Sequence, residues 1–330
     1  MERKGISVVG NILADNVKIV EKFPEKGMLA TILEESLAVG GCVPNTAIDL
    51  KRLDKDLEVF AYGKIGNDDK GKYVLSVMNN EGLNTDGVII SDLAPTSYSD
   101  VITVKETGER TFFHHRGANA KLVPEDIDLD KITSKILHIG YLMLLDSFDK
   151  LDENDNTPMA DFLKKVQEKG IKTSIDIVSE SSGNFKKVAK ASLPFCDYVI
   201  INEIESGEIA GIKPRDEDGN LIDDNVIQIL KVLLELGVKE KVVIHCPEKG
   251  FCMNKNGDLT IVPSIKLPKG FIKGSVGAGD AFCAGSLYSI YHGYSDKEML
   301  EFSNLVAINC LSMPDSISGV RAKERLKEVL

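Results

Sequence analysis

Short runs of β-branched and aliphatic residues recur along the chain, and segments with helical periodicity separate them. The runs that have the length and composition of buried strands are ISVVG from residue 6, EVFAYG from 58, ILHIG from 136, KTSIDIV from 172, YVIIN from 198 and KVVIH from 241. Helical segments begin at Pro44, Met159 and Asp223, and the last ends at Gly237. This alternation predicts an α/β fold with a doubly wound, mostly parallel sheet flanked by helices, and ligands at the carboxyl ends of the strands.

One region departs from this alternation. In SYSDVITVKETGERTFFHHRG, residues 97–117, two β-rich runs flank Thr107-Gly108-Glu109, which indicates a hairpin with no helix after it. Together with the stretch before residue 40, it predicts a small antiparallel β-sheet built from segments about 15–38 and 96–116. Such a sheet serves either as a lid over a site or as an edge ornament, and the pattern alone does not choose between them.

Composition narrows the class of protein. With 330 residues, of which 43% are apolar, the chain can bury a large core, and we expect a single α/β domain over residues 1–330. A net charge of -11 opposes broad contact with nucleic acid or anionic lipid, so a small-molecule partner is expected. The cysteines lack C-x-x-C spacing, and the chain shows neither a signal-peptide pattern nor a membrane-length apolar run. We therefore expect a cytoplasmic protein without disulfides and without a zinc motif.

The stretch GSVGAGDAFCAG, residues 274–285, carries the first candidate chemistry. Gly277, Ala278 and Gly279 precede Asp280 and a long apolar run, which predicts the start of a buried helix. Backbone N–H groups there, unobstructed by side chains and aligned with the helix dipole, would bind a phosphate oxygen or a developing negative charge. A carboxylate beside such an anion site is suited to act as a general base for an attacking hydroxyl group. The alternative is that Asp280 only caps its helix.

Two common nucleotide-binding patterns are not supported. The chain contains no G-x-x-x-x-G-K-[ST] sequence, which argues against a P-loop. A dinucleotide-binding G-x-G-x-x-G pattern also fails, because Phe282 takes the third glycine position and the motif lies near the carboxyl terminus.

Several motifs in order resemble one family. GAGDAFCAG at 277–285 is similar to the carboxyl-terminal signature of the ribokinase-like carbohydrate kinases, the PfkB family, and VGGCVPNTA at 39–47 is similar to their amino-terminal glycine signature. GNILAD at 10–15 resembles their first strand with its sugar-binding acid, and INEIE at 201–205 matches their N-x-x-E element. The resemblance covers essentially the whole chain, and the four motifs occur in the family's order.

The resemblance implies a role for each matching residue. Asp280 would be the catalytic base, with residues 277–279 as its anion hole. Asn202 and Glu205 would organise Mg²⁺ and the ATP triphosphate, Glu205 through water; without the resemblance, Asn202 would be an ordinary helix cap. The remaining implied contacts are Asp15, Gly40, Gly41 and Asn45 for the sugar, and Lys249, Gly250 and Gly319 for the nucleotide.

Three departures limit what the resemblance implies. Gly274-Ser275-Val276 stand where the family usually has an acid followed by two threonines, so potassium activation does not follow. A second departure is at 244–250, where IHCPEKG replaces the small polar residues of a turn that lies near the nucleotide in the family. The third is at 312–320, where SMPDSISGV lacks the family's usual Gly-Ala pair near the adenine, and Gly319 would serve instead.

Arg116 follows the predicted hairpin and is a further candidate for substrate contact, because its planar guanidinium suits the carboxylate of an acid sugar. The alternative is a solvated strand end.

The sequence thus predicts an ATP-dependent, Mg²⁺-requiring kinase that phosphorylates a hydroxyl group of a small sugar such as ribose, fructose or 2-keto-3-deoxygluconate. A nucleoside kinase of the same fold is one alternative, although 6% aromatic residues and the absence of tryptophan disfavour a base-stacking pocket. The other is a non-catalytic sugar-binding regulator, which would have no use for a general base. The resemblance also implies a homodimer formed through the small sheet.

Overall fold

A nine-stranded sheet runs through the centre of the computed structural model, which describes residues 3–178 and 184–330. Its strands, in spatial order, are β13 (Leu259–Pro263), β12 (Lys249–Asn254), β11 (Lys241–His245), β10 (Tyr198–Asn202), β9 (Lys172–Ile177), β8 (Ile136–Leu142), β1 (Ile6–Gly10), β4 (Val59–Gly66) and β5 (Asn84–Ser91). All neighbours from β11 to β5 pair in parallel, while β12 and β13 are antiparallel. The predicted parallel strands are therefore confirmed.

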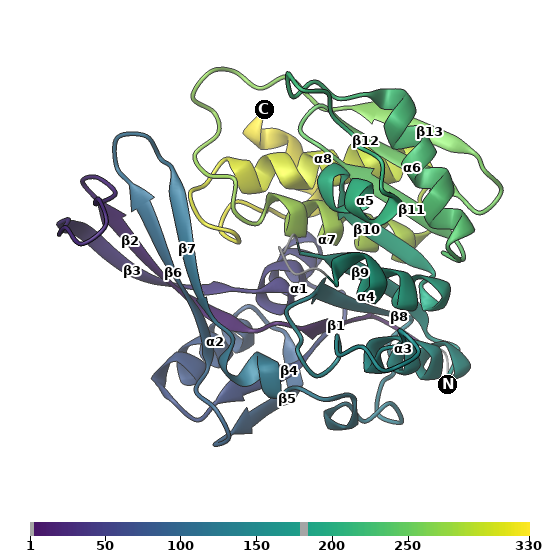
Figure 1. The fold of residues 1–330 in the computed structure, drawn as a ribbon, viewed down its shortest axis with the longest axis horizontal. Coiled ribbons are helices and arrows are strands. Elements are labelled where there is room, and N and C mark those ends of the chain that lie inside the picture. Colours follow the sequence, from purple (N-terminus) through teal and green to yellow (C-terminus); the bar gives the residue numbers. More distant parts are fainter. Residues whose placement is uncertain (1–2, 179–183) are drawn as a thin grey trace.

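Helices cover both faces of this sheet (Figure 1). One face packs against α1 (Cys42–Leu53), α2 (Asp69–Asn80), α7 (Ala278–His292) and α8 (Asp296–Leu311). The other packs against α3 (Pro158–Glu168), α4 (Phe185–Ser192), α5 (Glu203–Ala210) and α6 (Asp223–Glu235). Alternate residues of β1 serve the two cores, with Ile6 and Val8 on one side and Val9 on the other. Burial on both faces explains why the central strands are continuous apolar runs.

Short 3₁₀ helices complete the regular structure, at Gly117–Lys121, Pro124–Asp126, Leu193–Phe195 and Lys323–Val329.

A second sheet of four strands stands beside the main body, at the left of Figure 1. Its order is β3 (Ile32–Gly40), β2 (Leu13–Val20), β6 (Ser97–Val104) and β7 (Arg110–His115). The pairs β2–β3 and β6–β7 are antiparallel hairpins, and a parallel pairing of β2 with β6 joins them. The predicted small sheet is confirmed, and its β6–β7 turn has Gly108 at φ 70°, a conformation that glycine adopts without strain.

The helix ends also follow the sequence. α7 ends at Gly293, whose φ is 73°, and the Ser295 hydroxyl and the Glu298 carboxylate form the capping box that begins α8. Among the helices of the described segments, none combines the length and apolar character that crossing a membrane requires.

Candidate active site

The start of α7 carries Asp280 in a tightly packed setting. Gly277 precedes the helix with φ 80°, and a Cβ atom built there would lie 2.5 Å from the Cβ of Ser316. Only glycine fits this close approach. Asp280 follows in the first turn and is 5% exposed, and α7 is buried from Asp280 to Ser289. The helix therefore presents its first-turn N–H groups and one carboxylate together at its buried end.

Two donors hold the carboxylate of Asp280. The side-chain amide of Asn45 donates to Oδ2 at 2.9 Å, and the Tyr141 hydroxyl donates to the same oxygen at 2.8 Å. Asn45 is itself oriented by the Ser316 hydroxyl, which donates to Asn45 Oδ1 at 2.9 Å. Among the described residues no donor reaches Oδ1 of Asp280, so this oxygen is available to accept a proton.

Burial dominates the electrostatics of Asp280. It raises the pKa of the carboxyl to about 6, and the negative charge of Asp15 adds to the rise, while the hydrogen bonds from Asn45 and Tyr141 oppose it. The group is therefore ionised at neutral pH and binds a proton more readily than an exposed aspartate does, as a general base requires.

Asp15 lies across the cavity on β2. A Cβ atom at Gly40 would lie 2.4 Å from Asp15 Oδ2, so the glycine makes room for the carboxylate. Gly41 has φ 91°, and a Cβ there would lie 2.4 Å from the Asn11 carbonyl oxygen. Burial raises the pKa of Asp15 to about 6, against the lowering effects of a hydrogen bond from Ser99 and the positive charge of Arg110.

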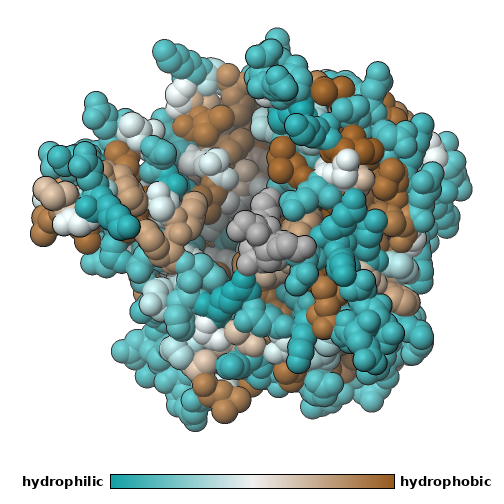
Figure 2. Space-filling view, in the orientation of Figure 1, coloured by the Kyte–Doolittle hydropathy of each residue, from teal (hydrophilic) through white to brown (hydrophobic). Residues whose placement is uncertain are grey.

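Asp15, Gly41, Asn45 and Asp280 share one cavity of about 540 Å³ at the carboxyl ends of the parallel strands, whereas Gly40 is not part of its lining. Its polar lining includes Asp15, Asn45, Ser99, His114, Tyr141, Asp176, Asn202, Glu205, His245 and Asp280. A wider cleft of about 1040 Å³ adjoins it between the small sheet, α2 and the loops at 272–276 and 314–318, and shares Asp15, Phe112 and Val276 with it. Figure 2 shows the molecule hollowed between the small sheet at the left and the main body.

Asn202 and Glu205 lie where β10 meets α5. The Asn202 side chain accepts from the Glu205 N–H at 2.8 Å, and Glu205 Oε2 accepts from the Asn202 N–H at 3.2 Å, which forms a capping box. Both residues also line the cavity, and Glu205 is 7% exposed. The pair therefore caps α5 and is also available to a ligand in the cavity. Its carboxylate and amide oxygens suit a hard cation such as Mg²⁺.

Several predicted site residues lie elsewhere or face other partners. Lys249 Nζ donates to Asp223 at 2.7 Å, and Gly250 faces Leu300 of α8. A Cβ at Gly319 would lie 2.2 Å from the Asn309 carbonyl oxygen, so packing against the end of α8 requires glycine there. None of these three lines either cavity. Ala278 is likewise outside the lining, while Gly277 and Gly279 on either side of it are part of it.

Arg116 is also outside the lining of both cavities. Its guanidinium forms an ion pair with Asp146 and donates to the Met143 carbonyl oxygen at 3.2 Å. The basic side chains in the lining of the wider cleft are instead Arg110 and Lys273, and Arg110 donates to the Pro314 carbonyl oxygen at 3.1 Å.

Sequence reasoning assigned no role in the site to Arg110, Tyr141, Asp176 or His245. Tyr141 has φ 60° just after Gly140, and no sequence signal marks this conformation. Asp176 and His245 each lie at the end of a predicted strand, so the rule that ligands bind at carboxyl strand ends could have found them.

His245 borders the predicted anion hole in its neutral form. Its ring packs on Phe282 with centroids 4.9 Å apart, and burial lowers its pKa to about 4. A Cβ at Gly279 would lie 3.4 Å from His245 Cε1, which shows how closely the ring approaches the start of α7.

Comparisons with known proteins agree with this geometry. A family model for pfkB family carbohydrate kinases matches residues 3–322. The chain is 23% identical over 325 residues to a ribokinase of Arabidopsis thaliana, and the alignment covers 98% of this chain and 80% of that protein. It is 24% identical over 327 residues to a 2-dehydro-3-deoxygluconokinase of Dickeya dadantii, with coverage of 98% and 99%.

A solved structure of a ribokinase has a similar fold. The solved structure of Arabidopsis thaliana ribokinase complexed with ribose and ATP matches with a TM-score of 0.82 at 21% identity, covering 100% of this chain and 99% of that one.

Proposed function

The chain belongs to the pfkB family of carbohydrate kinases and is a phosphotransferase of the ribokinase-like class, and on that premise we propose that it transfers the γ-phosphoryl group of ATP to a hydroxyl group of a small sugar. The observation that carries the proposal is the position of Asp280, a buried carboxylate at the start of α7 that opens onto the same cavity as Asp15 and Asn45.

Asp280 acts as the general base in this proposal. Its Oδ1 accepts the proton of the acceptor hydroxyl as that oxygen attacks the γ-phosphorus, and ADP departs with the electrons of the broken P–O bond. Asn45 and Tyr141 keep Oδ2 fixed, so Oδ1 stays directed at the acceptor. The N–H groups of residues 277–279 stabilise the negative charge on the transferring group, and His245 beside them adds no positive charge of its own at neutral pH.

Glu205 and Asn202 would hold Mg²⁺, Glu205 through water, since their carboxylate and amide oxygens are the donors that this cation prefers. When bound there, the ion would neutralise charge on the ATP phosphates. The positions proposed here for the nucleotide at Lys249, Gly250 and Gly319 rest on the family resemblance alone.

Asp15, Gly40, Gly41 and Asn45 form the proposed acceptor pocket. The Asp15 carboxylate accepts hydrogen bonds from sugar hydroxyls, and the two glycines let the acceptor approach the backbone. Ribose, fructose and 2-keto-3-deoxygluconate are the acceptors that we propose, in line with the names of related proteins, which include a probable fructokinase of Arabidopsis thaliana. In this proposal Arg116 would contact an acid sugar only after leaving Asp146.

The small sheet is proposed to close over the acceptor. Strands β2, β3, β6 and β7, hereafter the lid, contribute Asp15, Ser99, Phe112 and His114 to the cavity. Excluding water from the site favours phosphoryl transfer to the sugar over hydrolysis of ATP.

A nucleoside is the second acceptor class that a specific feature supports. The wider cleft adjoins the proposed sugar pocket at Asp15 and has apolar walls that include Val17, Tyr73 and Phe112. A base attached to the sugar would extend into it. The third candidate is a sugar-binding regulator without turnover. Such a protein would not need Asp280 as a buried base held by Asn45 and Tyr141.

The test is ATP turnover by the purified protein with pentoses, ketohexoses, sugar acids and nucleosides, with and without potassium. We expect one acceptor class to respond strongly. We also expect little effect of potassium, because Gly274 offers no carboxylate and a Cβ there would lie 2.7 Å from the Pro314 carbonyl oxygen.

Two variants make the result specific. Asp280→Asn should lower kcat by about 10²- to 10⁴-fold with acceptor binding nearly intact, and Asp69→Asn, on the exposed surface of α2, should match the wild-type protein. Turnover of Asp280→Asn at near wild-type rates would reject the assigned base, and silence across the panel with detectable sugar binding would favour the regulator.

A further inference from the structure

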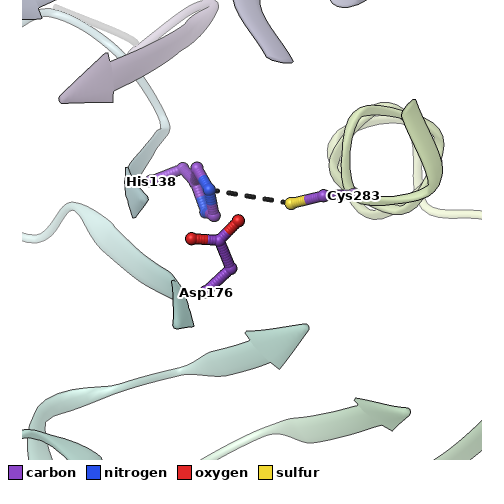
Figure 3. Close-up of side chains that lie close together, drawn as sticks. All are labelled: His138, Asp176 and Cys283. Atoms are coloured by element: carbon purple, nitrogen blue, oxygen red, sulfur yellow. Dashed lines mark hydrogen bonds between the residues drawn. The ribbon is translucent and has the colours of Figure 1, made fainter. Parts of the chain in front are cut away.

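Three buried side chains with metal-binding chemistry meet beneath the floor of the cavity. His138 projects from β8, Asp176 from β9 and Cys283 from α7, so the sheet and the helix that packs on it both contribute (Figure 3). Each offers one ligand atom, and these atoms lie within 4.8 Å of one another. They are 0%, 8% and 2% exposed, respectively. The cluster thus brings imidazole, carboxylate and thiol together in a site that solvent barely reaches.

The separation of Cys283 and His138 matches that of two adjacent ligands of a tetrahedral ion. Cys283 Sγ and His138 Nε2 are 3.6 Å apart. A tetrahedral zinc ion with typical bonds to sulfur and to imidazole nitrogen separates those two atoms by about 3.6 Å. A cation can therefore bind between them without a change in their separation.

His138 is already oriented as a ligand. Its Nδ1 is hydrogen-bonded to the Ser174 hydroxyl at 3.1 Å, which turns Nε2 toward Cys283. Metal-binding histidines commonly have such a partner on the second ring nitrogen, because it fixes the ring and its tautomer.

Asp176 connects the cluster to the cavity. Its Oδ1 accepts from the Tyr141 N–H at 2.5 Å, and the residue also forms part of the cavity lining. His138 and Cys283 do not line the cavity, so an ion would reach them past the Asp176 carboxylate. Once both groups are deprotonated by the bound ion, the carboxylate and the thiolate would together balance the charge of a divalent cation, which offsets the main penalty for burying one.

We propose that His138, Asp176 and Cys283 form a binding site for a borderline transition-metal cation of the Zn²⁺ class, with a fourth position open toward the cavity. Binding forms bonds from the metal to Nε2, to a carboxylate oxygen and to the sulfur, and releases the thiol proton, with any carboxyl proton, to solvent. The nitrogen and sulfur donors distinguish the site from the oxygen donors around Glu205, because thiolate and imidazole favour Zn²⁺ over Mg²⁺.

The direct test is a titration of metal-free protein with Co²⁺, followed by absorption, in the presence of excess Mg²⁺. We expect one Co²⁺ per chain, a thiolate-to-cobalt charge-transfer band and the intense visible bands of a tetrahedral site, all removed by added Zn²⁺. If no charge-transfer band appears, or if Mg²⁺ abolishes it, the cluster is only a hydrogen-bonded part of the core and the proposal is wrong.

Matched variants assign the ligands. Cys283→Ser should abolish the charge-transfer band, whereas Cys196→Ser, at another buried free cysteine, should retain it. Ser174→Ala removes only the partner of His138 Nδ1 and should weaken Co²⁺ binding about 10- to 100-fold. Circular dichroism checks that each variant is folded. If Cys283→Ser does not fold, His138→Gln and Ser174→Ala decide the matter, and unchanged Co²⁺ affinity in both would reject the site.

Discussion

Asp280 has an environment that is useful for chemistry and costly for stability. The unfolded chain ionises this carboxyl near its ordinary pKa of 3.8, while burial raises the pKa to about 6 in the folded protein. Between these two values the folded state holds a proton that the unfolded state has lost. The free energy of unfolding therefore falls as the pH rises through this range, and the ionised carboxylate costs about 3 kcal/mol at neutral pH.

The residue-scale prediction is that Asp280→Asn is more stable than the wild-type protein at pH 8. An amide can keep the partners Asn45 and Tyr141 without a buried charge, and it also removes repulsion with Asp15. Calorimetric melting at pH 8 and at pH 5 measures this. The advantage of the variant should shrink at pH 5, where the wild-type carboxyl is largely protonated. A variant that melts below the wild-type protein at pH 8 would contradict the assigned burial cost.

At the scale of the element, the course of β7 explains why Arg110, which the sequence did not single out, lines the wider cleft, whereas the predicted Arg116 does not. Side chains alternate along a strand, so Arg110, Phe112 and His114 share the face that lines the two cavities. His115 points the other way and stacks on Tyr98, with ring centroids 5.1 Å apart. Arg116 would rejoin the inner face if the strand continued, but β7 ends at His115 and a 3₁₀ helix begins at Gly117.

The element-scale prediction concerns Arg110, which reaches from the lid to the Pro314 carbonyl oxygen. Arg110→Ala removes this link and a positive charge near Asp15, so the KM for the acceptor should rise about tenfold, the effect of losing roughly 1.4 kcal/mol, with a smaller change in kcat. Steady-state kinetics over a range of acceptor concentrations measure both.

Arg325→Ala, an exposed arginine paired with Glu328, is the matched control and should leave the kinetics unchanged. Arg116→Ala provides the competing test. If it raises KM and Arg110→Ala does not, the sequence-based assignment of Arg116 is correct and the inner face of β7 does not contact the acceptor.

At the scale of the whole molecule, the site exists only because distant segments converge. Asn45 comes from α1, Tyr141 from the end of β8, Asp280 from α7 and Ser316 from the loop after α8. One continuous set of hydrogen bonds joins the four. The lid adds Asp15 from the far side of the cavity.

The edge strands of the lid carry exposed apolar side chains. Ile32 and Phe113 are 48% and 56% exposed, and β3 and β7 are edge strands of the small sheet. Figure 2 shows hydrophobic residues toward the tip of the lid, at the left. We propose that a second copy of the chain covers this surface, because edge strands with exposed apolar side chains favour pairing.

The whole-molecule prediction is a dimer in solution. Sedimentation equilibrium should give twice the chain mass of 36.1 kDa, and Phe113→Asp should shift the equilibrium toward the monomer. Leu93→Asp, at an exposed apolar residue in the segment after β5, is the control. A wild-type protein that remains monomeric at high concentration would reject the lid as an interface.

Local features of the chain were sufficient to predict much of this protein. The apolar runs marked the parallel strands because both faces of the main sheet are buried, and the capping residues marked the start of α8 and the end of α7. The order of the motifs indicated the family, and GAGD placed a carboxylate at a helix start. Each of these signals lies within a few neighbouring residues, where backbone preferences and side-chain periodicity act directly.

Tertiary structure alone decided the partners of those residues. Asn45 meets Asp280 across 235 residues of chain, and Cys283 meets His138 across 145. Cysteine spacing therefore gave no sign of the His138–Asp176–Cys283 cluster, because its ligands come from three separate elements. The end of β7 likewise decided which arginine faces the cleft. Such contacts depend on how the sheet, the helices and the lid pack, and packing brings together residues that share no local pattern.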